Sequence, residues 1–209
     1  MTRLFADSPC PPPGPSRLEL PVKVTPTNWA DVADAIQRVW NPVLMKGPVS
    51  NGAVAVLLAQ WHLETAEGRA TPNYNLAGIK CVKPEAQSHQ FFTTRESADG
   101  GITLLTVKGK QAANCFRAWI SLDDGVRGWL QTIASAYGET LPSLLAGNGA
   151  AWARAIGPSA RPGRSWYTGP ETNPQGGGYV QVLSALSPRY QVKLATQLRP
   201  PRVLVETVR

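Results

Sequence analysis

One acidic residue, Glu64, lies where a helix pattern calls for an apolar side chain. In the stretch 52–68, Val54, Leu57 and Trp61 recur at helical spacing, which predicts a helix with one stripe facing a core. Glu64 follows Leu57 by seven residues, so it falls on the same stripe. Because an ionised carboxylate removed from water costs several kcal/mol, we expect Glu64 to be paired, protonated or placed on a cleft wall.

Two further acids, Glu96 and Asp99, lie at an expected β-hairpin. Residues 91–107 are rich in β-forming side chains on both sides of a turn-forming Ser-Ala-Asp-Gly-Gly segment. An acid on a helix facing a cleft, combined with acids on a hairpin, suits glycoside cleavage, in which one carboxyl protonates the leaving oxygen. The second carboxylate would act as base or nucleophile, and Glu96 is the first candidate, followed by Asp99.

Helical patterns account for most of the remaining chain. The first helix is expected to begin at Thr27 or Asn28 and to stop at Asn41-Pro42. Ser121 has the spacing of a capping box, so the two aspartates that follow it are explained by a helix start. The further helices are expected at 122–137, 141–146, 150–156 and 179–186.

The length and composition indicate one folded domain with irregular ends. A chain of 209 residues with 43% apolar content can bury a core, and seven tryptophans are too many for a disordered chain. Seven prolines in residues 1–26 exclude a helix there and predict an arm or linker. We therefore expect an arm at 1–26, a domain at 27–190 and a basic tail at 191–209.

The net charge of +7 favours polyanionic partners, including nucleic acid, anionic membrane surfaces and bacterial cell walls. The basic residues are scattered and not interleaved with aromatic residues, so we do not expect nucleic-acid binding. No apolar run reaches 18 residues, so no membrane span is expected. The N-terminus has no secretory signal pattern, which predicts delivery by another route.

The three cysteines do not predict a metal site. Cys10, Cys81 and Cys115 contain no CxxC pair and have no nearby histidine. Cys81 and Cys115 could form a bridge, or they could both be reduced and half-buried. We expect neither a metal nor another cofactor.

Two segments of the sequence resemble a known family. The run LAQWHLETAEG at 58–68, followed by YNLAGIK at 74–80, resembles the signature of bacterial glucosaminidases of glycoside hydrolase family 73. Weaker similarities lie at 93–96, 116–122 and 167–179, so the resemblance extends over about residues 28–190. It implies a lysozyme-like α+β fold, mainly α, with a small β-hairpin lobe between helices.

The resemblance also implies roles for individual residues. Glu64 would be the general acid, Glu96 would be its hairpin partner, and Tyr167 would contact the substrate. Tyr74 and Asn75 are further substrate-binding candidates, and these two residues and Tyr167 could instead pack the loops, since aromatic rings both stack on sugar faces and fill loops. Substrate-binding roles are also expected for Trp61 and Asp99. The sequence departs from the family pattern at Ala66, at Ala77 and in the long loop 161–178.

These observations predict a bacteriolytic hydrolase of peptidoglycan glycan strands, acting as an N-acetylglucosaminidase. The alternatives are a muramidase or lytic transglycosylase acting on the same polymer, and a catalytically silent wall-binding or baseplate module. We expect a monomer that acts in the cell wall, in the periplasm or outside the cell. A secretion apparatus, a phage or a carrier protein would deliver it.

Overall fold

The computed structural model describes residues 19–81, 87–91, 95–98, 101–104, 115–167, 170–172 and 178–197. Its helices are α1 (Trp29–Leu44), α2 (Asn51–Thr65), α3 (Leu122–Ala136), α4 (Leu141–Leu145), α5 (Gly149–Ala155) and α6 (Tyr179–Gln197), with a short 3-10 turn at Gly138–Thr140. Its strands are β1 (His89–Phe91), β2 (Arg95–Ala98), β3 (Gly101–Leu104) and β4 (Cys115–Arg117). The fold is therefore mainly helical α+β, as expected.

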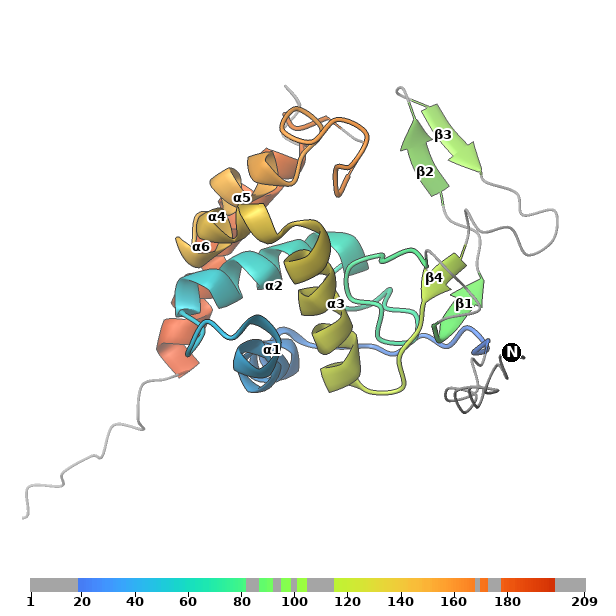
Figure 1. Ribbon diagram of the computed structural model, residues 1–209, viewed down its shortest axis with the longest axis horizontal. Helices are drawn as coiled ribbons and strands as arrows, with labels where there is room; N and C mark the ends of the chain where they lie inside the picture. The colour runs from blue at the N-terminus through green and yellow to red at the C-terminus, as the bar shows by residue number, and fades with distance from the viewer. Residues whose placement is uncertain are drawn as a thin grey trace, which may run out of the picture.

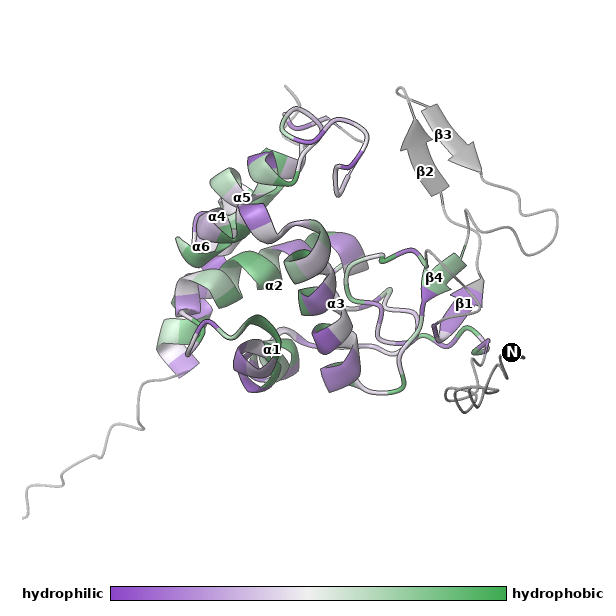
Figure 2. Ribbon diagram, viewed as in Figure 1, coloured by the Kyte–Doolittle hydropathy of each residue, from purple (hydrophilic) through white to green (hydrophobic). Residues whose placement is uncertain are grey.

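Helix α2 lies at the centre of the helical part, in contact with α1, α4, α5 and α6 (Figure 1). All residues from Ala53 to Trp61 are buried, so the expectation of a single apolar stripe is wrong. The run is apolar on every face, and such a helix is stable when other helices surround it. Figure 2 shows this green core helix beside the purple outer surfaces of α1 and α3.

A tight turn ends α2 one residue after Glu64. The helix stops at Thr65, and Ala66, Glu67 and Gly68 all adopt positive φ angles. A Cβ on Gly68 would lie 2.0 Å from the backbone oxygen of Thr27, so glycine is required at that position. The segment 66–68 therefore holds the last helical turn of α2, which carries Glu64, close to Thr27, just before the N-cap residue of α1.

Two helices continue past the ends expected from the sequence, which were Asn41-Pro42 for the first helix and residue 186 for the last. Helix α1 includes Pro42 and ends at Leu44, and α6 includes Pro188 and ends at Gln197. Tyr190 and Leu194, which lie beyond Pro188, are buried in the core. Their burial offsets the cost of about 3 kcal/mol for proline inside a helix. None of the described helices is both long and apolar enough to cross a membrane.

The strands form two separate antiparallel pairs, β1 with β4 and β2 with β3. The expected hairpin is β2–β3, but Ser97, Ala98 and Gly101, which were expected in its turn, lie in the paired strands, since Ala98 pairs with Gly101 and Ser97 pairs with Ile102. Phe91 belongs to β1 and pairs with Cys115. Cys115 is joined to Cys81 by a disulfide, so of the two states left open by the sequence the structure has the bridged one.

Residues 19–26, which the sequence placed in the arm, run along the folded domain. The backbone N–H of Leu20 donates to His89, and that of Asn73 donates to Lys23, each over 2.8 Å. Thr25 is buried and donates its hydroxyl to the carbonyl of Thr71, also over 2.8 Å. These bonds attach the end of the arm to the loop that follows α2.

Candidate active site

Glu64 lies in the last turn of α2, where its half-buried carboxyl group meets residues from two distant segments. Tyr179, the first residue of α6, donates its hydroxyl to Oε1 of Glu64 over 2.8 Å. Trp166, in the loop after α5, donates its indole Nε1–H to the same oxygen over 3.2 Å. One carboxyl oxygen is therefore fixed by two neutral donors.

Both donors are themselves held in place by aromatic packing. The Tyr167 ring stacks on Tyr179 with centroids 3.9 Å apart and planes 7° apart. Its hydroxyl donates to the carbonyl of Ala153 over 3.2 Å. The Trp166 ring lies 5.2 Å from that of Tyr137. The carboxyl of Glu64 is thus held by a preorganised aromatic cluster.

The surroundings of Glu64 favour its neutral form. Burial raises its pKa to about 7, although the hydrogen bonds from Tyr179 and Trp166 act in the opposite direction. Among the residues that the structure describes, no lysine or arginine pairs with this carboxyl. The C-terminal end of α2 also carries the negative pole of the helix dipole, which disfavours a carboxylate. Glu64 can therefore hold a proton near neutral pH.

The position of that proton follows from the hydrogen bonds. Because Oε1 accepts from both Tyr179 and Trp166, the O–H of the neutral carboxyl must lie on Oε2. Oε2 faces Gly78, where an added Cβ would lie 3.7 Å away. Gly78 is exposed and has a φ of 61°. The oxygen that bears the proton thus faces a position that carries no side chain.

Asn75 organises the loop that brings Gly78 to Glu64. Its buried side-chain amide donates to the carbonyls of Ile79 and Arg117, over 2.9 and 3.0 Å, and its oxygen accepts the N–H of Ile79 over 2.8 Å. All of these contacts are with the backbone. The substrate-binding role expected for Asn75 stays a prediction, and in this structure its amide holds the loop together.

Trp61 is also a structural residue. It is fully buried, and its indole N–H donates to Oγ1 of Thr27 over 3.1 Å. Its ring is enclosed in the core, and the substrate-binding role expected for it stays an untested prediction. Because residues three apart share one face of a helix, Trp61 packs directly below Glu64 and holds the last turn of α2 against Thr27.

Tyr74 and Tyr167 are both half-buried, and for both the substrate-binding role stays a prediction. Tyr74 adopts a φ of 52°, and its backbone N–H donates to Oγ1 of Thr25 over 2.8 Å. It lines a pocket of about 280 Å³ next to the end of the arm. Tyr167 supports Tyr179, as described above.

The partner carboxylate also stays a prediction. Glu96 lies in β2 opposite Thr103, and its side chain is outside what the structure describes. Asp99 lies outside the described residues altogether.

Sequence reasoning did not identify Trp166 and Tyr179 as partners of Glu64. They are 102 and 115 residues away from it in the chain, and they flank a loop rich in glycine and proline. The available signal was their chemistry, since both are aromatic residues with a hydrogen-bond donor at the tip.

We compared the chain with family models, curated proteins and solved structures, and only the solved structures gave matches. No family model and no curated protein matches the chain. Among solved structures, a peptidoglycan hydrolase mutant from Sphingomonas sp. A1 is 20% identical, with a TM-score of 0.51 over 80% of this chain and 92% of that one. A glycoside hydrolase domain from Salmonella typhimurium FlgJ is 16% identical, with a TM-score of 0.47 over 79% and 99% of the two chains. The chain thus shares its fold with the Sphingomonas peptidoglycan hydrolase.

Proposed function

We propose that the protein is a glycoside hydrolase that cleaves the glycan strands of peptidoglycan, with Glu64 as its general acid. The observation that carries this proposal is the state of the Glu64 carboxyl. Its pKa is raised to about 7 by burial, one oxygen is fixed by Tyr179 and Trp166, and the other faces exposed Gly78. A neutral carboxyl aimed at an open position is what protonation of a glycosidic oxygen requires.

The geometry supports a defined sequence of events. Oε2 of Glu64 transfers its proton to the glycosidic oxygen while the bond from that oxygen to the anomeric carbon breaks. The leaving sugar departs as an alcohol, and Glu64 becomes a carboxylate. The donors from Tyr179 and Trp166 then become charge-assisted hydrogen bonds, which stabilise the charge as it develops.

The opposite side of the sugar requires a second group. Glu96 is the proposed partner, either as the base that activates a water molecule or as a stabiliser of the oxocarbenium-like carbon. The resemblance to glycoside hydrolase family 73 supports this assignment. Glu96→Gln is expected to lower turnover while leaving the pH dependence due to Glu64 in place, which a kcat profile against pH would show.

We propose N-acetylglucosaminidase specificity on the same resemblance. A muramidase and a lytic transglycosylase are the alternatives, and their products differ. Digestion of purified sacculi followed by borohydride reduction and mass spectrometry would reveal a reduced N-acetylglucosamine end, a reduced N-acetylmuramic acid end or a non-reducing anhydro end. Only the first result agrees with the specificity proposed here.

A catalytically silent wall-binding module is the alternative from another class. The raised pKa of Glu64 favours catalysis, because a binding site has no need of a half-buried acid without a cationic partner. The release of soluble fragments from sacculi distinguishes the hydrolase from the binding module. Protein that sediments with sacculi but releases no soluble fragments, at any pH from 5 to 8, would establish the binding module and overturn the hydrolase.

The proposed place of action is the cell wall or the periplasm, after delivery by a secretion apparatus, a phage or a carrier protein. The disulfide between Cys81 and Cys115 supports a compartment outside the reducing cytosol, because such bridges persist in oxidising environments.

A further inference from the structure

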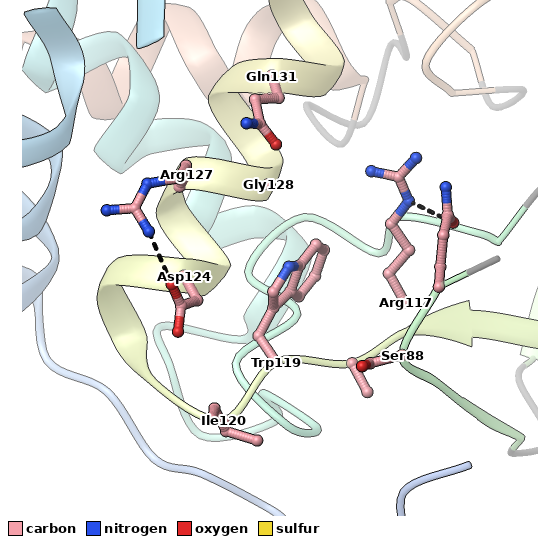
Figure 3. A pocket seen from close by; sticks show the side chains of 10 residues that line it. Ser88, Arg117, Trp119, Ile120, Asp124, Arg127, Gly128 and Gln131 are labelled. Carbon is pink, nitrogen blue, oxygen red and sulfur yellow. Dashed lines mark hydrogen bonds and ion pairs between the residues drawn. The ribbon is translucent and has the colours of Figure 1, made fainter. Parts of the chain in front are cut away.

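A second recess, separate from the Glu64 carboxyl, lies between β4, the segment that follows it and α3 (Figure 3). It has a volume of about 440 Å³. Its principal walls are Gln87, Arg117, Trp119, Ile120, Gly128 and Gln131. None of these residues was assigned a role by the sequence.

Arg117 is the charged group of this recess. Its side chain is half-buried, and burial lowers its pKa. Its Nε–H donates to Oε1 of Gln87 over 3.0 Å, which fixes the plane of the guanidinium. No acidic side chain among the described residues pairs with Arg117. Within the part of the chain that the structure describes, its two terminal nitrogens have no acidic partner, and a guanidinium fork matches a carboxylate.

The other arginine at this recess is already neutralised. Nη1 of Arg127 lies 2.7 Å from Oδ1 of Asp124. Figure 3 shows the Arg127 side chain turned toward Asp124 and away from Arg117, with the Trp119 ring between the two arginines. The positive charge available to a ligand is thus that of Arg117.

The wall beside Arg117 suits a ligand with an apolar body. The Trp119 ring packs directly on Gly128, where a Cβ would come within 2.2 Å of it, so the ring is held in one place. Ile120, next along the chain, is 80% exposed. A carboxylate attached to small apolar groups fits a fixed guanidinium beside these side chains.

A single loop connects this recess with the proposed acid. The N–H of Arg117 donates to the carbonyl of Ile79 over 2.9 Å, and Asn75 donates to the carbonyl of Arg117 over 3.0 Å. Gly78, between these two loop residues, stands beside Oε2 of Glu64. The loop that places Gly78 beside the acid is therefore bonded directly to the backbone of Arg117.

We propose that this recess binds a carboxylate of the peptide stem that the glycan strand carries, with Arg117 as the anion-binding residue and Trp119 and Ile120 as the apolar wall. The inference rests on the proposed function, because it takes peptidoglycan as the substrate. It makes the protein selective for strands whose stem carboxyl groups are free.

The test compares kcat/KM on three preparations of one set of glycan strands. The first has intact stems, the second has stem carboxyl groups converted to methylamides, and the third has stems removed by an amidase, which leaves the lactyl carboxylate. Wild-type protein is expected to prefer intact stems by about tenfold over either other preparation, the lower range for a hydrogen-bonded charge. Arg117→Gln should reduce this preference to about one while its rate on methylamide strands stays within about twofold.

Arg38→Gln is the matched control, since it removes the same charge from an arginine outside the recess that pairs with Asp123 over 2.7 Å. It should keep the tenfold preference. Arg117→Lys, which keeps a charge without the fork, should restore part of the preference. Melting temperatures of all variants separate a lost site from a lost fold.

The outcomes distinguish the two proposals. If wild-type protein cleaves all three preparations equally, the carboxylate site is wrong while the hydrolase stands. Equal rates on intact and stem-free strands, both faster than on methylamide strands, would show that the recess accepts the lactyl carboxylate freed by the amidase as well as a stem carboxylate, which would overturn its selectivity for the stem. If nothing is cleaved, the hydrolase fails, and calorimetric binding of a disaccharide-peptide and of its methylamide decides the site. Tighter binding of the free acid by wild type, lost in Arg117→Gln, would support the site, and equal binding would overturn it.

Discussion

The end of α2 and the start of α3 both carry carboxyl groups, and the fold treats them in opposite ways. Glu64 lies in the last turn of α2, has neutral donors and has its pKa raised to about 7, chiefly by burial. Asp123 lies in the first turn of α3 and pairs with Arg38, and the hydrogen bond from Arg38 is the main reason that its pKa is lowered. The two groups thus favour different protonation states.

Position on the helix accounts for part of this difference. The N-terminal end of a helix favours negative charge, and the C-terminal end disfavours it. The partners account for the rest, because a guanidinium stabilises a carboxylate, whereas a tyrosine and a tryptophan can bond an oxygen without supplying charge. A charged carboxylate serves the fold, while a neutral one that costs stability when ionised is suited to proton transfer.

Of the substitutions that test this comparison, Glu64→Gln is expected to have the largest effect, which is a loss of turnover. Gln keeps the shape and can accept from Tyr179 and Trp166, but it has no proton to transfer. Release of soluble fragments from sacculi should fall by on the order of a hundred- to ten-thousandfold. Glu67→Gln is the control, because Glu67 lies in the following turn, paired with Arg69, and should have only a mild effect. Turnover of Glu64→Gln within about threefold of wild type would show that Glu64 is not the acid.

The same substitution should stabilise the protein in a pH-dependent way. The folded pKa of about 7 is above the unfolded value of 4.5, so the folded state binds more protons between these values and wild-type stability falls as pH rises through them. At pH 8, Glu64→Gln should be more stable than wild type by at most about 3 kcal/mol. At pH 4 the two should be equal. Urea unfolding at both pH values measures this, and a gain that is equal at both would contradict the raised pKa.

Tyr179→Phe should change the pH dependence of turnover and leave the folded structure intact. It removes a hydrogen bond that lowers the pKa of Glu64, so the alkaline limb of kcat should move to higher pH. Loss of one positioning bond should lower the maximal rate about three- to tenfold. The ring keeps its stack on Tyr167. An alkaline limb that stays in place or moves down would mean that this limb does not report Glu64.

The sequence predicted the elements whose signals are local. Ser121 caps α3 by accepting the N–H of Asp124 over 3.2 Å, as its spacing indicated. The helix expected at 150–156 is α5, which Asn148 caps by accepting the N–H of Ala151 over 3.0 Å. Glu64 was found because a carboxylate interrupts an apolar pattern. Cap spacing and apolar periodicity both depend on residues within a few positions of one another, and the tertiary structure agrees with them at these sites.

What could not be predicted depends on contacts between distant segments. The pattern around Trp61 indicated one buried face, but surrounding helices bury it on all faces. The last helix was expected to end at residue 186, yet the buried Tyr190 and Leu194 extend α6 to Gln197. A proline-rich arm gave no sign that the backbone N–H of Thr25 would donate to Thr71, because extended segments pair through backbone groups that every residue has.

Asp123→Asn is expected to have the smallest effect, and it tests the ion-paired carboxylate at the start of α3. Arg38 donates to both carboxyl oxygens of Asp123, over 3.2 and 2.7 Å, but both side chains are well exposed. Exposed ion pairs contribute about 0–1 kcal/mol, and salt screens them. Asp123→Asn should therefore lower stability at pH 7 by less than about 1 kcal/mol.

The sign of this effect with pH is opposite to that of Glu64→Gln. Because the folded pKa of Asp123 is lowered, its contribution is present above the unfolded pKa and is lost as pH falls through the folded value. The difference between Asp123→Asn and wild type should therefore be largest at neutral pH, shrink in strong acid and shrink again in 1 M salt, as urea unfolding would show. If Asp123→Asn stabilised the protein at pH 7 as Glu64→Gln is expected to do, the two helix ends would not differ in the way the structure indicates. The neutral state of Glu64 would then not support its assignment as the general acid.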